Sequence, residues 1–254
     1  MNDYTNFIFL SLVFMRMSGF VLLNPIFSRQ NVPVQVKTGL VIALTVIVYT
    51  ATPVPDIMPA TFLEYGVLLL KEFAVGYVIG FVITLFSYVI IFAGDFIDME
   101  QGISMSKIYD AQSNSSISVS GTYYNALYML MFFAVDAHVA LLNILITSHK
   151  VVPYGSVTFG QELPQSILDM FVMCTEFAVK MAFPVVAIEF LCTIGMGILM
   201  KAIPQINIFV VNIQLKIFVG LCLMLMLFTP MTDFVQQLIV IMMEHLQGAL
   251  QLLI

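Results

Sequence analysis

One uncharged stretch constrains this chain more than any other feature of its sequence. Residues 73–94 form a run of 22 positions without a charged side chain, and most of the run is apolar. As an α-helix this run is about 33 Å long at ~1.5 Å per residue, which matches the ~30 Å hydrocarbon core of a bilayer. The run therefore predicts a membrane-spanning helix.

The rest of the chain has the same character. Of its 254 residues, 61% are hydrophobic and only 9% are charged, whereas soluble domains carry about a quarter charged residues. Lipid or partner subunits must therefore cover much of the apolar surface. Only helices and closed barrels satisfy every backbone polar group in lipid, and these long runs lack the alternation of barrel strands. We predict an all-α integral membrane protein.

Prolines and polar turns divide the sequence into about six to eight helices, several of them broken by proline, within one domain covering residues 1–254. Pro184 should kink the fifth apolar segment or divide it in two, since proline cannot continue the hydrogen-bond ladder of a helix. The polar interval 95–122 is predicted to be a loop or a broken helix. The expected apolar segments are 7–23, 39–49, 60–94, 123–147, 165–200, 206–229 and 233–254.

Composition and motifs argue against several classes of function. The net charge of −6 provides no basic footprint for nucleic acid. Cys174, Cys192 and Cys222 lie singly in apolar stretches, without the spacing of a zinc site. The sequence contains no phosphate-binding loop, no GxSxG and no HExxH motif. We therefore expect no enzyme, and no catalytic, cofactor-binding or metal-binding residues.

Seven charged residues fall within or beside the apolar segments. Because a charge in lipid costs at least ~2.5 kcal/mol, such side chains normally face protein or water. Two of them are four positions apart and can pair on one helix face. A proton or ion path remains open, but charges paired in a protein core or at subunit contacts are favoured, since no graded series of carboxylates and histidines follows one helix. The seven are Arg16, Glu72, Asp136, Glu176, Lys180, Glu189 and Lys216.

Five blocks between residues 7 and 229 together form a recognisable pattern. The chain is similar, in their order and spacing, to the FliR family of flagellar protein export, whose counterpart in virulence type III secretion is the SctT family. The blocks are Arg16 to Lys37 with Asn24-Pro25-Ile26-Phe27 and Val32-Pro33; Glu72 with Gly76 and Gly80; Ala93-Gly94-Asp95-Phe96-Ile97-Asp98 with Gly102; His138 with Ser148 and Pro153; and Gly197 to Leu221 with Pro204-Gln205-Ile206-Asn207-Ile208-Phe209 and Leu215-Lys216-Ile217.

The resemblance is incomplete at a few positions. Ala111 stands where the family usually has proline after aspartate, and Asn212 and Gln214 stand near a usual glycine and proline. Lys201 stands where the family usually has an arginine before the Pro-Gln pair. These departures affect the expected helix break after Phe209, whereas the GxxxG spacing of Gly76 and Gly80 favours close helix packing on physical grounds. The expected helix-packing residues are Gly76, Gly80, Pro204, Gln205, Asn207 and Phe209.

The resemblance implies a role in the bacterial inner membrane. The family's proteins are single-copy subunits of a helical export gate in the flagellar basal body, built with FliP-type and FliQ-type subunits and contacted by an FlhB-type protein. The gate is a conduit for unfolded flagellar proteins. In that family a polar loop plugs the conduit, and it matches residues 107–122 here. The plug candidates are Ile108, Tyr109, Asp110, Asn114, Ile117 and Val119.

Two other functions remain open on the sequence. A secondary transporter or ion-channel subunit for a small solute would predict repeated halves with helices broken at matching positions, and such halves are not evident. A membrane scaffold without a conduit is the second alternative. Co-purification with two smaller, repeated membrane subunits would favour the gate over both.

Overall fold

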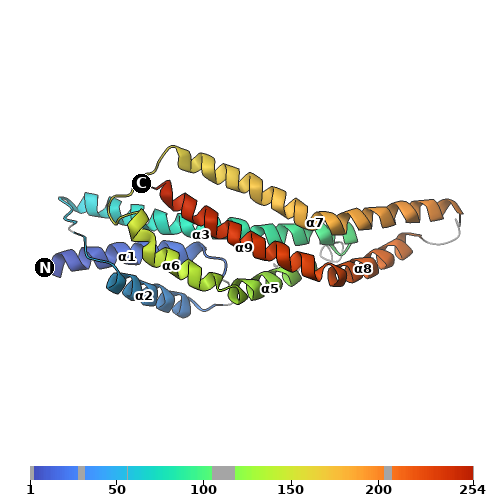
Figure 1. Ribbon diagram of the computed structural model, residues 1–254, viewed down its shortest axis with the longest axis horizontal. Coiled ribbons are helices and arrows are strands. Elements are labelled where there is room, and N and C mark those ends of the chain that lie inside the picture. Colours follow the sequence, from blue (N-terminus) through green and yellow to red (C-terminus); the bar gives the residue numbers. More distant parts are fainter. Residues whose placement is uncertain (1–2, 28–31, 56, 105–117, 203–207, 254) are drawn as a thin grey trace. The chain divides into compact units, whose positions relative to one another are not determined.

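The fold is all-helical, as the sequence predicts. A computed structural model describes residues 3–27, 32–55, 57–104, 118–202 and 208–253, and no strand occurs among them. Its helices are α1 (Asp3–Leu23), α2 (Val34–Ala51), α3 (Phe62–Gln101), α5 (Val119–Ala134), α6 (Ala137–Val151), α7 (Glu162–Ala202), α8 (Ile208–Met226) and α9 (Phe228–Gln251) (Figure 1).

Several of these helices are long and apolar enough to cross a membrane. Over the described residues, α1, α2, α3 and α7 meet that requirement by length and composition. The number rises to six if each of two bent pairs, α5 with α6 and α8 with α9, counts as one span. The prediction of an integral membrane protein is therefore confirmed.

The chain divides into two compact units. Unit 1 comprises Met1–Phe86, Asp136–Phe171 and Ile239–Ile254, and unit 2 comprises Ser87–Val135 and Val172–Leu238. The helices α3, α7 and α9 each supply residues to both units. The expectation of a single domain over residues 1–254 stays a prediction.

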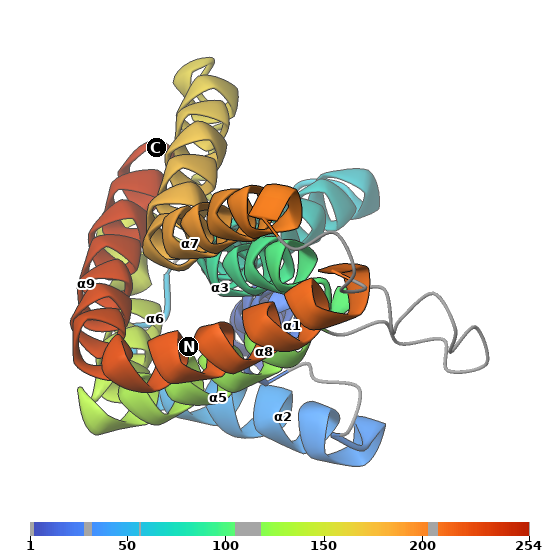
Figure 2. The ribbon, with the colours of Figure 1, turned by 90° about the vertical axis from the view of Figure 1, so that its right-hand side faces the viewer.

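Within unit 1, α2 packs against α1 and α6 (Figures 1 and 2). The helix α1 ends where the sequence predicts, because the Asn24 side-chain oxygen accepts hydrogen bonds from the backbone N–H of Ile26 (2.9 Å) and Phe27 (3.3 Å). This asparagine turn gives the chain an alternative to continuing the helix. The helix α2 likewise ends at Ala51, two residues before Pro53.

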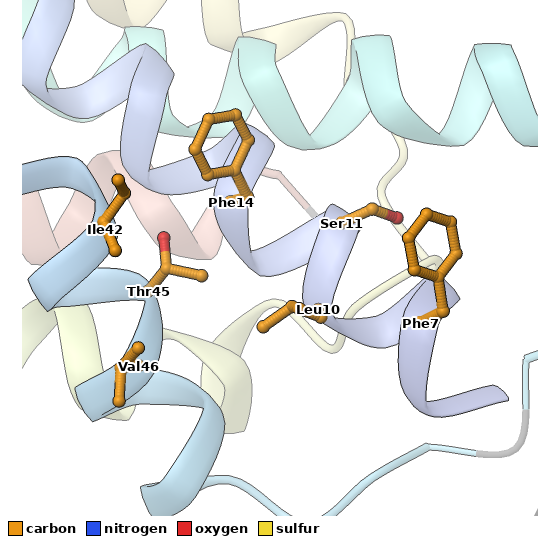
Figure 3. A pocket seen from close by; sticks show the side chains of 7 residues that line it. All are labelled: Phe7, Leu10, Ser11, Phe14, Ile42, Thr45 and Val46. Atoms are coloured by element: carbon orange, nitrogen blue, oxygen red, sulfur yellow. The ribbon is translucent and has the colours of Figure 1, made fainter. Parts of the chain in front are cut away.

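An apolar groove lies between α1 and α2 in unit 1. Figure 3 shows its lining, with Ser11 and Thr45 as the only hydroxyl-bearing side chains among the lining residues. Both hydroxyls are already engaged, Ser11 with Ile8 and Tyr65 and Thr45 with the Val41 carbonyl oxygen. The groove, of about 340 Å³, therefore offers apolar contact without polar recognition. It is lined by Phe7, Leu10, Ser11, Phe14, Ile42, Thr45 and Val46.

The structure refines two predictions for unit 2 and its borders. The interval 95–122, predicted as a loop or a broken helix, begins and ends as helix, because α3 continues to Gln101, where Gly102 ends it with a φ of +77°, and α5 starts at Val119. The predicted single segment 123–147 is two helices, because Asp136 has a left-handed φ of 55° between α5 and α6. A short polar side chain tolerates this conformation better than most others.

Two prolines behave differently from each other. Pro184 lies inside α7, which the structure shows as one helix from Glu162 to Ala202 rather than two. Pro230 lies in the first turn of α9, where its missing N–H is not needed by the helix. The chain break predicted at Pro230 is instead at Leu227, between α8 and α9.

Candidate functional site

A buried ion pair joins three helices of unit 1. Arg16 on α1 and Glu72 on α3 are both fully buried, and the Arg16 Nε donates to Glu72 Oε2 at 2.6 Å. The other guanidinium nitrogens donate at 3.1 Å to the Ser148 hydroxyl on α6 and to the Val152 carbonyl oxygen. The pair therefore fixes α1 and α3 against the end of α6.

The loop after α6 completes this cluster. The backbone N–H of Gly155 donates to Glu72 Oε1 at 2.9 Å, so both carboxylate oxygens have donors. The Tyr154 ring lies against Arg16, whose Cζ is 4.0 Å from the ring centroid, in cation–π geometry. Burial raises the pKa of the Tyr154 hydroxyl to about 12, so this side chain is neutral beside the ion pair. The Arg16–Glu72 pair is therefore a hydrogen-bonded polar joint inside an apolar unit, whereas the buried Tyr154 hydroxyl has no hydrogen-bond partner among the described residues.

The GxxxG spacing lies directly beside this joint. A Cβ on Gly76 would collide with the Arg16 carbonyl oxygen and lie 2.8 Å from the backbone nitrogen of Phe20. A Cβ on Gly80 would lie 2.9 Å from the Phe20 carbonyl oxygen. A Cβ on Gly19 of α1 would likewise collide with the backbone of α3. The backbones of α1 and α3 are therefore in direct contact along this seam, as small residues permit.

A second polar joint, in unit 2, binds the start of α5. The Asp98 carboxylate on α3 accepts hydrogen bonds from the backbone N–H groups of Val119 (2.6 Å) and Ser120 (3.1 Å). The Ser118 hydroxyl, at the N-cap, accepts from the Gly121 N–H at 3.0 Å. Carboxylate and hydroxyl oxygens suit a helix N-terminus because its first N–H groups lack helical partners and carry partial positive charge.

Glycines allow the two helices to meet at this joint. A Cβ on Gly94 would collide with the backbone of Gly121, so α3 and α5 touch through bare backbone. We use the name α5 anchor for Gly94, Asp98, Ser118 and Gly121. The α5 anchor holds together the two ends of the connection that runs from Gly102 to the N-cap of α5.

The plug candidates fall in or beside this connection. Ile108, Tyr109, Asp110, Asn114 and Ile117 lie outside the residues that the structure describes. Val119 is the first residue of α5, and its side chain is largely exposed. Residues 118–122 of the predicted loop therefore belong to the N-cap and first turn of a helix.

The remaining charges occupy three different settings. In unit 2 the Lys216 Nζ donates to Glu100 Oε1 and to the Glu100 carbonyl oxygen, both at 2.9 Å. Lys180 and Glu176 form the pair that their spacing predicts, at 2.7 Å, on an exposed face of α7. Glu189 is fully buried, and neither of its oxygens has a hydrogen-bond partner among the described residues. Asp136 lies at the break before α6.

Some site residues were not apparent from the sequence. Tyr154 and Gly155 gave no signal of their contact with the ion pair, because they lie more than 80 positions from both charges. Gly94 and Asp98 belonged to a recognised block, but their partners at 118–121 did not. Among the predicted packing residues, Pro204, Gln205 and Asn207 lie outside the described residues, and Phe209 belongs to α8. In the described part of the chain, no cluster of three His, Cys, Asp or Glu side chains could hold a metal ion.

These features define a class of protein. A set of apolar, membrane-length helices held by buried polar joints is an integral membrane protein. The sequence comparison gives the family: residues 7–242 match the family described as bacterial export proteins, family 1, and the chain belongs to it. It is thus a membrane component of a bacterial protein export system.

Individual relatives resemble the chain over most of its length. It is 28% identical over 248 residues to the flagellar biosynthetic protein FliR of Bacillus subtilis (strain 168), covering 95% of this chain and 94% of that protein. It is 23% identical to the protein of the same name from Escherichia coli (strain K12), covering 88% and 85%. It is 26% identical to Yop proteins translocation protein T of Yersinia pestis, covering 79% and 77%.

Proposed function

We propose that this chain is the FliR-type subunit of a flagellar protein export gate in the bacterial inner membrane. The observation that carries this proposal is the 28% identity to a flagellar FliR protein over 95% of the chain. One copy assembles with FliP-type and FliQ-type subunits and contacts an FlhB-type protein. Together they form the conduit through which unfolded flagellar proteins pass.

The surface of α7 in unit 2 supports an assembly with other subunits. Only 17% of the most apolar part of α7 is buried within the chain. Glu176 and Lys180 lie on this exposed helix, and an ion pair is costly against lipid. A protein partner with polar groups of its own would remove that cost. The exposed apolar side chains on the same helix include Val172, Val179, Phe183, Phe190, Leu191 and Ile198.

We further propose that the connection between Gly102 and the N-cap Ser118 plugs the conduit. Support comes from the α5 anchor, because a plug needs both of its ends fixed to rigid helices. Asp98 and Gly94 fix the far end of the connection to α3, from which its near end departs at Gly102. A plug of this kind closes the gate to ions when no substrate is present.

Co-purification tests the assembly. The tagged full-length chain, extracted in mild detergent, is expected to bring down two smaller membrane proteins in several copies each, with one copy of itself. If the chain is monodisperse and alone, and transports a small solute in liposomes, the gate proposal is wrong and the transporter alternative stands.

A deletion tests the plug. Removing residues 110–117 leaves Ser118 and the α5 anchor intact, so the helices should still pack. The reconstituted gate is expected to leak ions, measured as current across a planar bilayer, while its subunit composition stays unchanged. Unchanged conductance in a correctly assembled gate would refute the plug.

A further inference from the structure

In unit 2, α7 and α3 each bring a polar side chain to one buried place, beside a glycine of α8. Glu189 on α7 is fully buried, and Gln101 at the end of α3 is 1% exposed. A Cβ on Gly220 of α8 would run into the Gln101 amide and would lie 3.0 Å from Glu189 Oε1. The carboxyl and the amide therefore approach the same point, over a backbone position that has no side chain.

Four atoms at this place lack partners. Both oxygens of Glu189, and both the oxygen and the nitrogen of the Gln101 amide, are buried without a hydrogen bond to any described residue. Buried polar side-chain atoms are nearly always paired, because an unpaired one forfeits its hydration. Four orphan atoms on two neighbouring side chains therefore require an explanation.

An ionised Glu189 would not resolve this deficit. A carboxylate has only acceptors, so the Gln101 oxygen, itself an acceptor, would stay unpaired. The charged groups whose fields reach Glu189 are Lys216 and Glu100. Two of the three Lys216 N–H donors go to Glu100, and neither Glu189 oxygen accepts a hydrogen bond from any described residue. If Glu189 were ionised, then Glu189, Glu100 and Lys216 together would carry one uncompensated negative charge in an apolar unit.

A single proton resolves the deficit completely. A carboxylic acid has one O–H donor beside one carbonyl acceptor, and a primary amide has one carbonyl acceptor beside an NH₂ group with two N–H donors, one of which can pair with the acid. Paired face to face, the acid donates to the Gln101 oxygen while the Gln101 nitrogen donates to the acid carbonyl. Each of the four orphan atoms then takes part in one hydrogen bond.

We propose that Glu189 is a proton-binding site, in which a neutral carboxylic acid pairs with the Gln101 amide above Gly220. The proton comes from water and forms one O–H bond, and no other bond is made or broken. The acid–amide pair ties α7 to α3 at the place where Lys216 ties α8 to α3. Loss of the proton leaves a buried, unpaired carboxylate and loosens α7. This inference rests on the geometry of unit 2 and not on the proposed export role.

Infrared difference spectroscopy tests the protonation state directly. The full-length chain, reconstituted in lipid with the membrane proteins that co-purify with it, is compared with its Glu189→Gln variant at neutral pH. The expected difference is the loss of one carboxylic-acid carbonyl band that shifts on exchange into deuterium oxide. Loss of carboxylate bands instead would overturn the proposal. Carboxylate bands that move when sodium replaces potassium would also overturn it, in favour of a cation site.

Matched variants separate the site from general effects on α7. Glu176→Gln, on the exposed face of the same helix, is expected to leave the carboxylic-acid band unchanged. Gly220→Ala places a methyl group against the Gln101 amide and is expected to shift the band of Glu189. If Gly220→Ala leaves the band where it was, Gln101 is not the partner and the proposed pair is wrong.

A measurement on the unchanged chain covers the case in which Glu189→Gln does not fold. Dicyclohexylcarbodiimide is apolar and modifies protonated carboxyl groups in membranes. Peptide mass mapping is expected to find Glu189 labelled and Glu72 unlabelled, because both Glu72 oxygens are already held by donors from Arg16 and Gly155. Labelling of both residues, or of neither, would contradict the proposal.

Discussion

The two units solve the same physical problem in opposite ways. Each contains a fully buried glutamate on a long apolar helix, Glu72 on α3 in unit 1 and Glu189 on α7 in unit 2. Glu72 has a guanidinium and a backbone N–H as donors, one for each oxygen. Glu189 has none among the described residues. A buried carboxyl can thus be kept as an ion by a complete set of donors or, as we infer for Glu189, as a neutral acid by one proton.

The same substitution at both glutamates tests whether the two buried carboxyl groups are stabilised in different ways. Glu72→Gln leaves the Arg16 guanidinium buried without a counter-ion, and breaking a buried pair costs about 3–5 kcal/mol. Glu189→Gln is expected to cost far less, since an amide replaces an acid that is already neutral. Thermal unfolding of the two variants in lipid measures the difference, and equal losses would contradict the contrast.

Replacing Arg16 and Glu72 together tests whether the charges themselves are needed for stability. Changing Arg16 and Glu72 together to methionine removes both charges, and a buried ion pair can often be replaced by apolar residues at little cost. The double variant is therefore expected to recover most of the stability lost by Glu72→Gln. A double variant less stable than Glu72→Gln would show that the hydrogen bonds from Arg16 to Ser148 and Val152 matter more than the charges.

The glycine seam beside the Arg16 joint should give the next largest effect. Gly76→Ala drives a methyl group into the Arg16 carbonyl oxygen, and overpacking of this kind costs about 1–3 kcal/mol. Gly66→Ala on the same helix is the control, because a Cβ there has open space around it. The midpoint of thermal unfolding should fall for Gly76→Ala only. Equal midpoints would show that α1 and α3 can separate without loss.

The α5 anchor should give a smaller loss of stability. Asp98→Ala removes the acceptor for two N–H groups at the start of α5, and loss of a helix cap costs about 0.5–2 kcal/mol. Asp233→Ala, at an exposed position of α9, is the control. The unfolding free energy should fall for Asp98→Ala alone. If the anchor also holds a plug, the reconstituted gate becomes leaky as well, whereas the control stays closed.

The smallest effect on stability is expected for the exposed pair on α7. Lys180→Met should change the unfolding free energy of the isolated chain by no more than about 0.5 kcal/mol, because exposed i,i+4 pairs contribute little. The same variant should reduce co-purification of partner subunits if this face of α7 meets them. Undiminished co-purification would place the partners on another face.

Much of the fold could be predicted from local signals. The ends of α1 and α2 follow from Asn24, Pro25 and Pro53, because each acts on the backbone within a few residues. The predictions failed where the deciding contact is distant. Residues 95–101 were predicted as part of a loop or a broken helix because they carry charges, but they continue α3, and Glu100 is paired with Lys216, 116 positions away. The sequence did not predict the break between α5 and α6 at Asp136, because the break depends on the φ angle of that one residue.

Local sequence patterns were enough to predict that the chain is helical, belongs in a membrane and contains charges that need protein around them. Those properties depend on composition and on runs along one helix, so they can be read without knowing any neighbour. Which charges are paired depends on contacts between distant helices, so it is visible in the folded chain alone. Arg16 and Glu72 form an ion pair across 56 positions, whereas Glu189 lies beside the Gln101 amide and Gly220 and has no hydrogen-bond donor among the described residues. A buried charge is tolerated or neutralised according to the donors within about 3 Å of it, and packing alone sets those distances.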